Sequence, residues 1–88
     1  MGGVMSEQLV GTVTHYFREP SVAVVHVDEG QLNVGDEIHV LGRTTDFTEK
    51  IFSMEVDHRK VEHAGVGEEI AIQVVARTRR HDQVFRIV

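Results

Sequence analysis

Short runs of β-branched and aromatic residues, each closed by turn residues, follow one another along almost the whole chain and restrict its fold more than any other feature. The runs LVGTVTHYF (9–17) and SVAVVHV (21–27) are typical of strands. Pro20 lies between them and cannot donate to a β-ladder, so the two runs predict a hairpin. Further extended segments are expected at residues 36–42, 47–59, 60–69, 68–76 and 83–88.

Alternation within these segments predicts which side chains face the core. In DEIHVLG (36–42), Ile38 and Val40 share one face and polar residues share the other, as in a half-buried strand. Residues 47–59 carry apolar side chains in both phases, which predicts a strand bent by a bulge near Ser53. Anchors from the later segments are expected at Val61, Ala64, Val66, Ile70, Ile72, Val74 and Ala76.

The stretch GQLNVGDE carries the clearest turn motif in the chain. Gly35 can adopt a positive φ and Asp36 can hydrogen-bond the local backbone, so this pair predicts a tight turn. The apolar residues before the pair are spaced two apart, which predicts that they anchor the loop on the core. The fold-signature turn therefore comprises Gly30, Leu32, Val34, Gly35 and Asp36.

The number and spacing of these segments predict the fold class. Six or seven short strands, tight turns and no amphipathic helix indicate an all-β chain that forms a small closed antiparallel barrel. Closure would also remove the exposed edges that favour aggregation. With 88 residues the chain can build one core, so we expect a flexible N-terminus at 1–8 and a single barrel domain at 9–88.

Composition excludes several classes of protein. The chain has no cysteine, which rules out disulfides, thiolate metal sites and thiol nucleophiles and makes a reducing cytoplasm the default compartment. Neither a signal peptide nor a membrane span is recognisable, so we expect a cytoplasmic protein with no membrane partner. The net charge of −5 opposes tight non-specific binding to nucleic acid, and no DNA partner is expected.

A basic stretch near the C-terminus is the best candidate for a binding surface. Residues 77–88 contain four arginines and one aspartate. Their guanidinium groups can grip phosphates, and nearby rings can stack on unpaired bases. Alternatively, the arginines pair with acidic residues of the body in surface bridges that contribute little. The candidate surface comprises Arg77, Arg79, Arg80, His81, Arg86, Tyr16 and Phe17, with Phe85 as a further ring.

Strand alternation constrains this surface in two places. It places Arg80 on the opposite side from Arg77 and Arg79, so the arginines need not form one patch. It also places the consecutive rings of Tyr16 and Phe17 on opposite faces, one in the core and the other on the surface or over the barrel mouth. An exposed ring there would offer a contact point for a peptide or a base.

No catalytic, cofactor or metal site is recognisable in the sequence. None of the serines, at positions 6, 21 and 53, lies in a Gly-x-Ser-x-Gly elbow, and the glycines match no phosphate-binding spacing. Neighbouring Asp57 and His58 would point to opposite faces of a strand. The six histidines show no metal-ligand spacing, and we expect packing or surface roles for His15, His26, His39, His58, His63 and His81.

The order of four segments carries a family resemblance. VGTVTHYF, VAVVHVDEGQLNVGDEIHVLG, IFSMEVDHRKVEHAGVGEEIAIQV and RTRRHDQVF together resemble the second, β-barrel domain of translation GTPases such as elongation factor Tu. They resemble more closely the C-terminal barrel of U32-family peptidases and the small proteins called translation elongation factor-like. The most specific residues are the fold-signature turn together with Ala64, Gly67 and Ile70.

The resemblance implies a translation-protein type of barrel and an accessory role. Translation GTPases hydrolyse GTP in another domain whose P-loop has no counterpart here, and U32 peptidase chemistry would also lie in another domain. We therefore expect a non-catalytic binding module that contacts RNA, the ribosome or a larger protein.

The alternative is an accessory subunit of an enzyme complex such as a U32-type peptidase. A third hypothesis is a barrel that binds a small ligand or a metal through its histidines. The sequence does not identify the partner or the contact face. It also leaves the oligomeric state open, because Val22 and Val24 on the outer face of one strand would suit a dimer.

Overall fold

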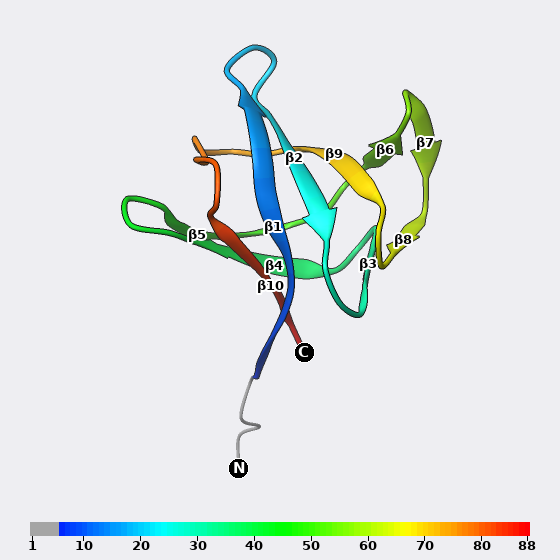
Figure 1. The fold of residues 1–88 in the computed structure, drawn as a ribbon, viewed down its shortest axis with the longest axis horizontal. Coiled ribbons are helices and arrows are strands. Elements are labelled where there is room, and N and C mark those ends of the chain that lie inside the picture. Colours follow the sequence, from blue (N-terminus) through cyan, green and yellow to red (C-terminus); the bar gives the residue numbers. More distant parts are fainter. Residues whose placement is uncertain (1–5) are drawn as a thin grey trace.

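The structure, a computed structural model, describes residues 6–88, and this part of the chain is built from strands and turns without a helix. The all-β prediction is therefore confirmed. No helix of the length and hydropathy needed to cross a membrane occurs in this part of the chain. The strands (Figure 1) are β1 (Glu7–Phe17), β2 (Val22–Val27), β3 (Gln31–Asn33), β4 (Glu37–Leu41), β5 (Asp46–Lys50), β6 (Met54–Val56), β7 (Arg59–Val61), β8 (His63–Gly65), β9 (Glu69–Gln73) and β10 (Gln83–Ile87).

Eight of these strands form one antiparallel sheet in the order β5-β4-β10-β1-β2-β9-β6-β7, and β3 pairs with β8 in a second, two-stranded sheet. The hairpin predicted around Pro20 is confirmed, since β1 pairs with β2 from Gly11 to Phe17. The other edge of β1 pairs with β10. The longest strand thus lies inside the sheet and is bonded on both sides, and its register shifts once in each ladder.

The predicted closed barrel of six or seven strands is wrong for the described residues, where ten strands are present and β5 and β7 are free edges. The chain leaves the ladder at residues 51–53 instead of continuing as one bulged strand. Ile51 is buried there and exchanges backbone bonds with the fold-signature turn, donating to Asp36 at 2.9 Å and accepting from Gly35 at 2.8 Å. Because β5 then pairs with β4 and β6 with β9 and β7, no ladder joins the two edges.

Charged side chains protect the edges that closure would have removed. Asp46 and Lys50 are exposed along β5, and Arg59 and Lys60 are exposed along β7. Charges of this kind on edge strands oppose pairing with another chain. A side chain of β5 also links this edge to the segment after β9, because the half-buried Glu49 carboxylate accepts the backbone N–H of Val75 at 2.9 Å.

A single core lies on the inner face of the curved sheet, and it follows the period-two pattern. Ile38 and Val40 are buried as predicted, and β2 and β9 bury alternate residues in the same way. The predicted anchor Val66 is wrong: it is 64% exposed, because it lies in the turn after β8. The buried apolar side chains are Val10, Val13, Ala23, Val25, Val27, Leu32, Ile38, Val40, Ile51, Met54, Ala64, Ile70, Ile72, Val74 and Val84.

The fold-signature turn closes between β3 and β4. Gly35 has a φ of 97°, and the Asp36 carboxylate accepts the backbone N–H of Asn33 at 2.8 Å. Leu32 is buried beneath the turn and Val34 packs partly on the core. Residues 1–5 of the expected flexible N-terminus lie outside the described residues, and the first strand begins at Glu7 instead of Leu9.

Close approach of β1 and β2 requires a glycine at position 11. A Cβ there would overlap the carbonyl oxygen of His26 and lie 2.9 Å from Cγ1 of Val25. Since these groups are held by the ladder and by the core, we expect Gly11→Ala to lower the free energy of unfolding by about 1–3 kcal/mol in urea unfolding. Gly65→Ala is the matched control, because a Cβ at Gly65 meets nothing within 4 Å. Equal losses in the two variants would contradict this account.

Candidate functional site

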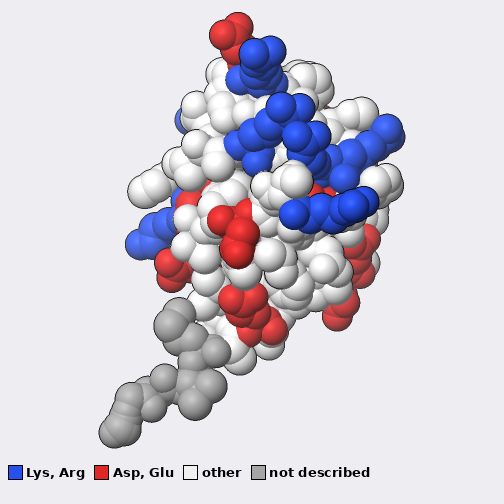
Figure 2. Space-filling model, turned by 90° about the vertical axis from the view of Figure 1, so that its left-hand side faces the viewer, with Lys and Arg blue, Asp and Glu red and all other residues white. Residues whose placement is uncertain are grey.

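Three arginines between β9 and β10 line one hollow, and we call Arg77, Arg79 and Arg80 the basic cluster. Figure 2 shows most of the visible Lys and Arg side chains gathered on the upper part of this face, and most of the Asp and Glu side chains below them. The hollow has a volume of about 290 Å³. Its other lining residues are Thr14, His15, Tyr16 and Thr78.

Backbone bonds fasten the basic cluster to β1 just beyond the end of the β1–β10 ladder. The N–H of His81 donates to the carbonyl of Val13 at 2.8 Å, and the N–H of Val13 donates to the carbonyl of Asp82 at 2.8 Å. The buried Asp82 carboxylate accepts the N–H of Arg79 at 2.7 Å. Arg79 Nε in turn donates to the hydroxyl of Thr44 at 2.9 Å. The arginines therefore lie on a loop of defined shape.

Two further residues fit this loop closely. A Cβ at Gly42 would overlap the carboxylate of Asp82, so glycine leaves room for the group that shapes the loop. Thr78 is buried under the cluster, and its hydroxyl has no hydrogen-bond partner within residues 6–88. Buried hydroxyls are normally satisfied by protein or by ordered water, so a polar partner is expected for this one.

The structure brings together only part of the candidate surface. His81 is exposed beside the cluster, whereas Arg86 is half-buried on β10, near the fold-signature turn. Phe85 packs against the ring of His39, with 6.1 Å between centroids. Tyr16 packs partly on the core and Phe17 is 54% exposed, as alternation predicts.

Ion pairing differs between these arginines. Arg86 lies 3.8 Å from the Asp36 carboxylate, which agrees with the alternative that arginines pair with acidic residues of the body. Within residues 6–88 no ion pair involves the basic cluster, and its one side-chain bond is the contact of Arg79 with a hydroxyl. The guanidinium groups of the cluster are thus available to an external anion.

A larger surface feature lies on the outer face of β2, β9 and β6. It is a groove of about 680 Å³, which we call the acidic groove. Its apolar residues include the outward valines of β2, which the sequence showed only as a second apolar face of that strand. Its acids come from three separate segments, the β1–β2 hairpin, β6 with the turn after it, and β9, which only the fold brings together. The lining residues are Phe17, Glu19, Pro20, Val22, Val24, Ser53, Glu55, Asp57, His58, Glu69, Ile70, Ala71 and Gln73.

The groove adjoins the basic cluster along β1. His15 lines the hollow of the cluster, and its ring stacks on that of Phe17 in the groove with 6.2 Å between centroids. Phe17 pairs with Val22 and His15 with Val24, so these four side chains share the outer face of the sheet. One partner could therefore contact both surfaces.

His39 has a carboxylate partner at each of its two ring nitrogens. Its Nδ1 lies 2.9 Å from the Glu7 carboxylate and its Nε2 lies 2.6 Å from that of Asp46. Hydrogen bonding first to Glu7 and then to Asp46 raises the pKa of His39. Both ring nitrogens donate in the protonated form, so the imidazolium joins β1, β4 and β5. This arrangement is a structural cross-link, since both nitrogens are already engaged.

A raised pKa in the folded state gives a defined pH dependence. The stabilisation by His39 is fully present below the unfolded value near 6.5 and is lost as pH rises through the higher folded pKa. We expect His39→Gln to lower the free energy of unfolding more at about pH 6 than at about pH 9. The difference should stay below about 1 kcal/mol, because the carboxylate partners are exposed. Urea titrations at both pH values measure it, and an equal loss at both would refute it.

A second network has the residue types of a catalytic triad in the wrong order. The Asp28 carboxylate accepts the hydroxyl of Thr12 at 2.7 Å and contacts Nδ1 of His26 at 2.9 Å. Hydrogen bonds from Thr12 and then from His26 lower the pKa of Asp28. A catalytic triad needs the hydroxyl to bond the imidazole, whereas here the hydroxyl bonds the carboxylate.

No group of three or more possible ligands in residues 6–88 is arranged to hold a metal ion.

Comparison with known proteins points to larger peptidases. No protein-family model matches the chain. A collagenase of Porphyromonas gingivalis is 31% identical over 86 residues, which cover 97% of this chain and 24% of the collagenase. A protein named as an uncharacterized protease of Methanocaldococcus jannaschii is 31% identical over 77 residues, which cover 86% of this chain and 19% of the relative. The chain spans about a fifth to a quarter of the length of these relatives.

One solved domain of a protein described as a peptidase has the same fold as this chain. The crystal structure of the C-terminal domain of a protein described as a U32 peptidase, from Geobacillus thermoleovorans, superposes with a TM-score of 0.83. The match covers 90% of this chain and 91% of that domain at 18% identity. The predicted likeness to the C-terminal domain of U32 peptidases is thereby supported at the level of the fold.

Proposed function

We propose that this chain is a non-catalytic accessory module of a U32-type peptidase assembly, in which it binds polypeptide near a catalytic partner. The observation that carries the proposal is the pattern of coverage. Almost the whole chain matches the peptidase relatives, but it accounts for only 24% and 19% of their lengths. Its fold matches the solved C-terminal domain of a protein described as a U32 peptidase. This match supports a role beside a larger catalytic part.

The side-chain chemistry of the described residues supports a binding role. The hydroxyl of Ser21 is engaged, since it donates to the carbonyl of Val74 at 2.8 Å and lies 3.2 Å from the Tyr16 hydroxyl. His26 of β2 and Asp28 just after it contact each other, but the Thr12 hydroxyl bonds the Asp28 carboxylate and not the imidazole, which gives no activated nucleophile. The acidic groove and the basic cluster, in contrast, are open to a partner.

The translation-factor interpretation competes with this proposal through one observation, the basic cluster. Three arginines around one hollow suit a phosphate, and the neighbouring His15 could stack on a base. RNA or ribosome binding therefore stays a prediction and forms the opposing outcome of the test. The cytoplasmic location expected from the sequence likewise stays a prediction.

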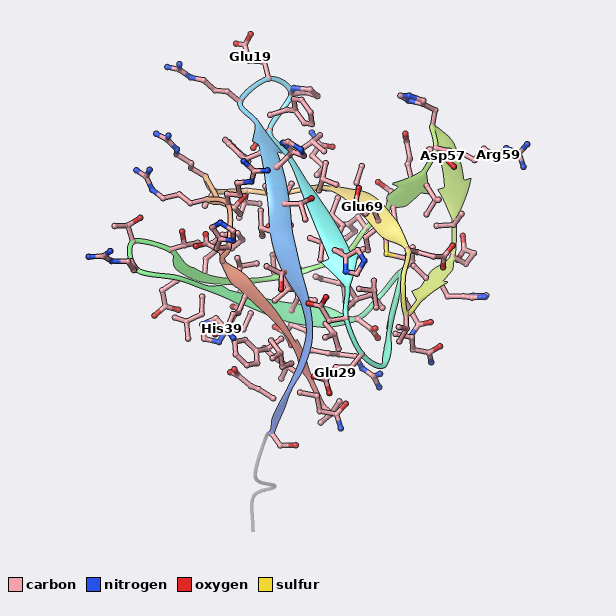
Figure 3. The ribbon with its side chains drawn as sticks, viewed as in Figure 1. Glu19, Glu29, His39, Asp57, Arg59 and Glu69 are labelled. Atoms are coloured by element: carbon pink, nitrogen blue, oxygen red, sulfur yellow. The ribbon has the colours of Figure 1, made fainter. Side chains whose placement is uncertain are left out.

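Recovery of partners from the cell that makes this protein, with and without RNase, tests the proposal. We expect a tagged chain to recover a U32-type peptidase irrespective of RNase treatment, and the purified pair to associate. Arg79→Glu and Arg80→Glu should not change RNA content, because the proposed partner is a protein. Arg59→Glu is the matched control, since Arg59 is exposed on β7 (Figure 3), outside both surfaces.

The opposite result would refute the proposal and favour the translation-factor interpretation. That result is recovery of ribosomal material which is sensitive to RNase, is lost in Arg79→Glu and Arg80→Glu, and is retained in Arg59→Glu.

A further inference from the structure

We infer that the acidic groove binds a short extended segment of polypeptide in which an apolar side chain is flanked by lysine or arginine. This inference rests on the proposed function, because it names the kind of polypeptide that the accessory module would bind. The groove has a volume of about 680 Å³, enough for a few side chains. Three features carry the inference: the apolar floor, the charge of the rim and the fixed position of the walls.

The floor of the groove is apolar although it lies on the outer face of the sheet. Val22 and Val24 of β2 pair with Gln73 and Ala71 of β9, so their side chains are neighbours on this face. Phe17, at the end of β1, is 54% exposed beside them. Outward apolar side chains that adjoin in a hollow favour an apolar occupant, because burial removes their surface from water.

The rim is rich in carboxylates. Glu19, Glu55, Asp57 and Glu69 line the groove together with His58, and its lining includes neither Lys nor Arg. Figure 3 shows Glu19 at the tip of the β1–β2 hairpin, Asp57 at the β6–β7 turn and Glu69 between them. Carboxylates on several sides of an apolar hollow focus a negative potential that attracts cationic side chains and repels phosphate. The charge therefore favours a basic polypeptide over a nucleic acid.

The walls are fixed before any partner arrives. The hairpin wall is tied to the end of β9, because Ser21 exchanges a side-chain and a backbone bond with Val74 at 2.8 and 3.0 Å. The opposite wall belongs to β6, which pairs with β9. The turn after β6 holds Asp57 and His58 at φ of 50° and 65°. Two successive residues with positive φ are typical of a tight hairpin turn, in which Asn-Gly has less backbone strain than Asp-His. A preformed groove avoids the ordering cost of binding.

A second copy of this chain is the competing occupant of the groove, because Phe52 is 83% exposed and lies two residues from the exposed Lys50. The basic cluster of another molecule supplies arginines, but it surrounds a hollow of its own and carries no protruding apolar side chain at its centre. Two concave surfaces cannot bury one another. Self-association is therefore an outcome that the test must separate from peptide binding.

Fluorescence anisotropy with three labelled peptides tests the inference on the isolated full chain. The reference peptide alternates Lys or Arg with Leu or Phe, one counterpart carries Glu in place of the basic residues, and another carries Ser in place of the apolar ones. We expect the reference peptide to bind at low salt and to weaken as salt rises, since the contacts are partly exposed. The acidic counterpart should not bind, and the polar counterpart should bind at least several-fold more weakly.

Substitutions assign that binding to the groove. Glu69→Lys should weaken the reference peptide about tenfold, because attraction becomes repulsion, and Phe17→Ser should weaken it through the floor. Asp57→Asn removes a rim charge and keeps a residue that tolerates positive φ, so its loss of affinity cannot come from misfolding. Glu29→Lys is the matched control: the same change of charge outside the groove (Figure 3) should alter affinity less than twofold.

The outcomes separate this inference from the proposed function. Equal weakening by Glu29→Lys and Glu69→Lys, or equal binding of the three peptides, would overturn the inference and leave the peptidase association standing. Binding that appears only as dimerisation on sedimentation would also overturn it. If the peptides bind as expected and no peptidase associates, the groove inference holds and the proposed function fails.

Discussion

Backbone pairing of β1 on both of its edges is the constraint on which the rest of the structure depends. β2 occupies one edge and β10 the other, and the approach to β2 is close enough that Gly11 has no room for a side chain. Where the β10 ladder ends, Val13 continues the bonding with His81 and Asp82. The same strand thus positions the hairpin that walls the acidic groove and the loop that carries the basic cluster.

The two surfaces are opposite in charge and adjoin at the end of β1, where His15 and Phe17 stack. Separate positive and negative surfaces on a small protein orient an approaching partner more than they raise the affinity of the final complex. A polypeptide with alternating basic and acidic stretches could be aligned across both surfaces. The cross-link through His39 joins β4 and β5 to the opposite end of β1, at Glu7, and includes no lining residue of either surface.

An accessory module acts by holding a substrate close to the active site of its catalytic partner. Linked to or assembled with a catalytic partner, a weak binding groove raises the local concentration of a substrate segment without forming any new contact at the reacting bond. This logic fits a chain whose fold matches a C-terminal domain and which covers only a minor share of the length of its relatives. It also fits a groove whose two sides are held by bonds to β9.

Local pattern was enough to predict the all-β class, the hairpin at Pro20 and the core positions of β4 and β9, because alternation and turn chemistry act over a few residues. It failed where strand order or a turn decides the outcome. The predicted barrel is open because no ladder joins β5 to β7, and this depends on which strands pair across the whole chain. Val66 is exposed because it lies in the turn after β8, where strand alternation no longer applies.

The candidate surfaces divide in the same way. The sequence by itself determined that arginines concentrate near the C-terminus and that β2 is apolar on both faces. Only the tertiary structure separated Arg86 from the basic cluster and gathered Glu19, Glu55, Asp57 and Glu69 around one groove. The physical reason is that composition and alternation are properties of neighbours in the chain, whereas a binding surface is made by strand order, which brings side chains from distant segments together.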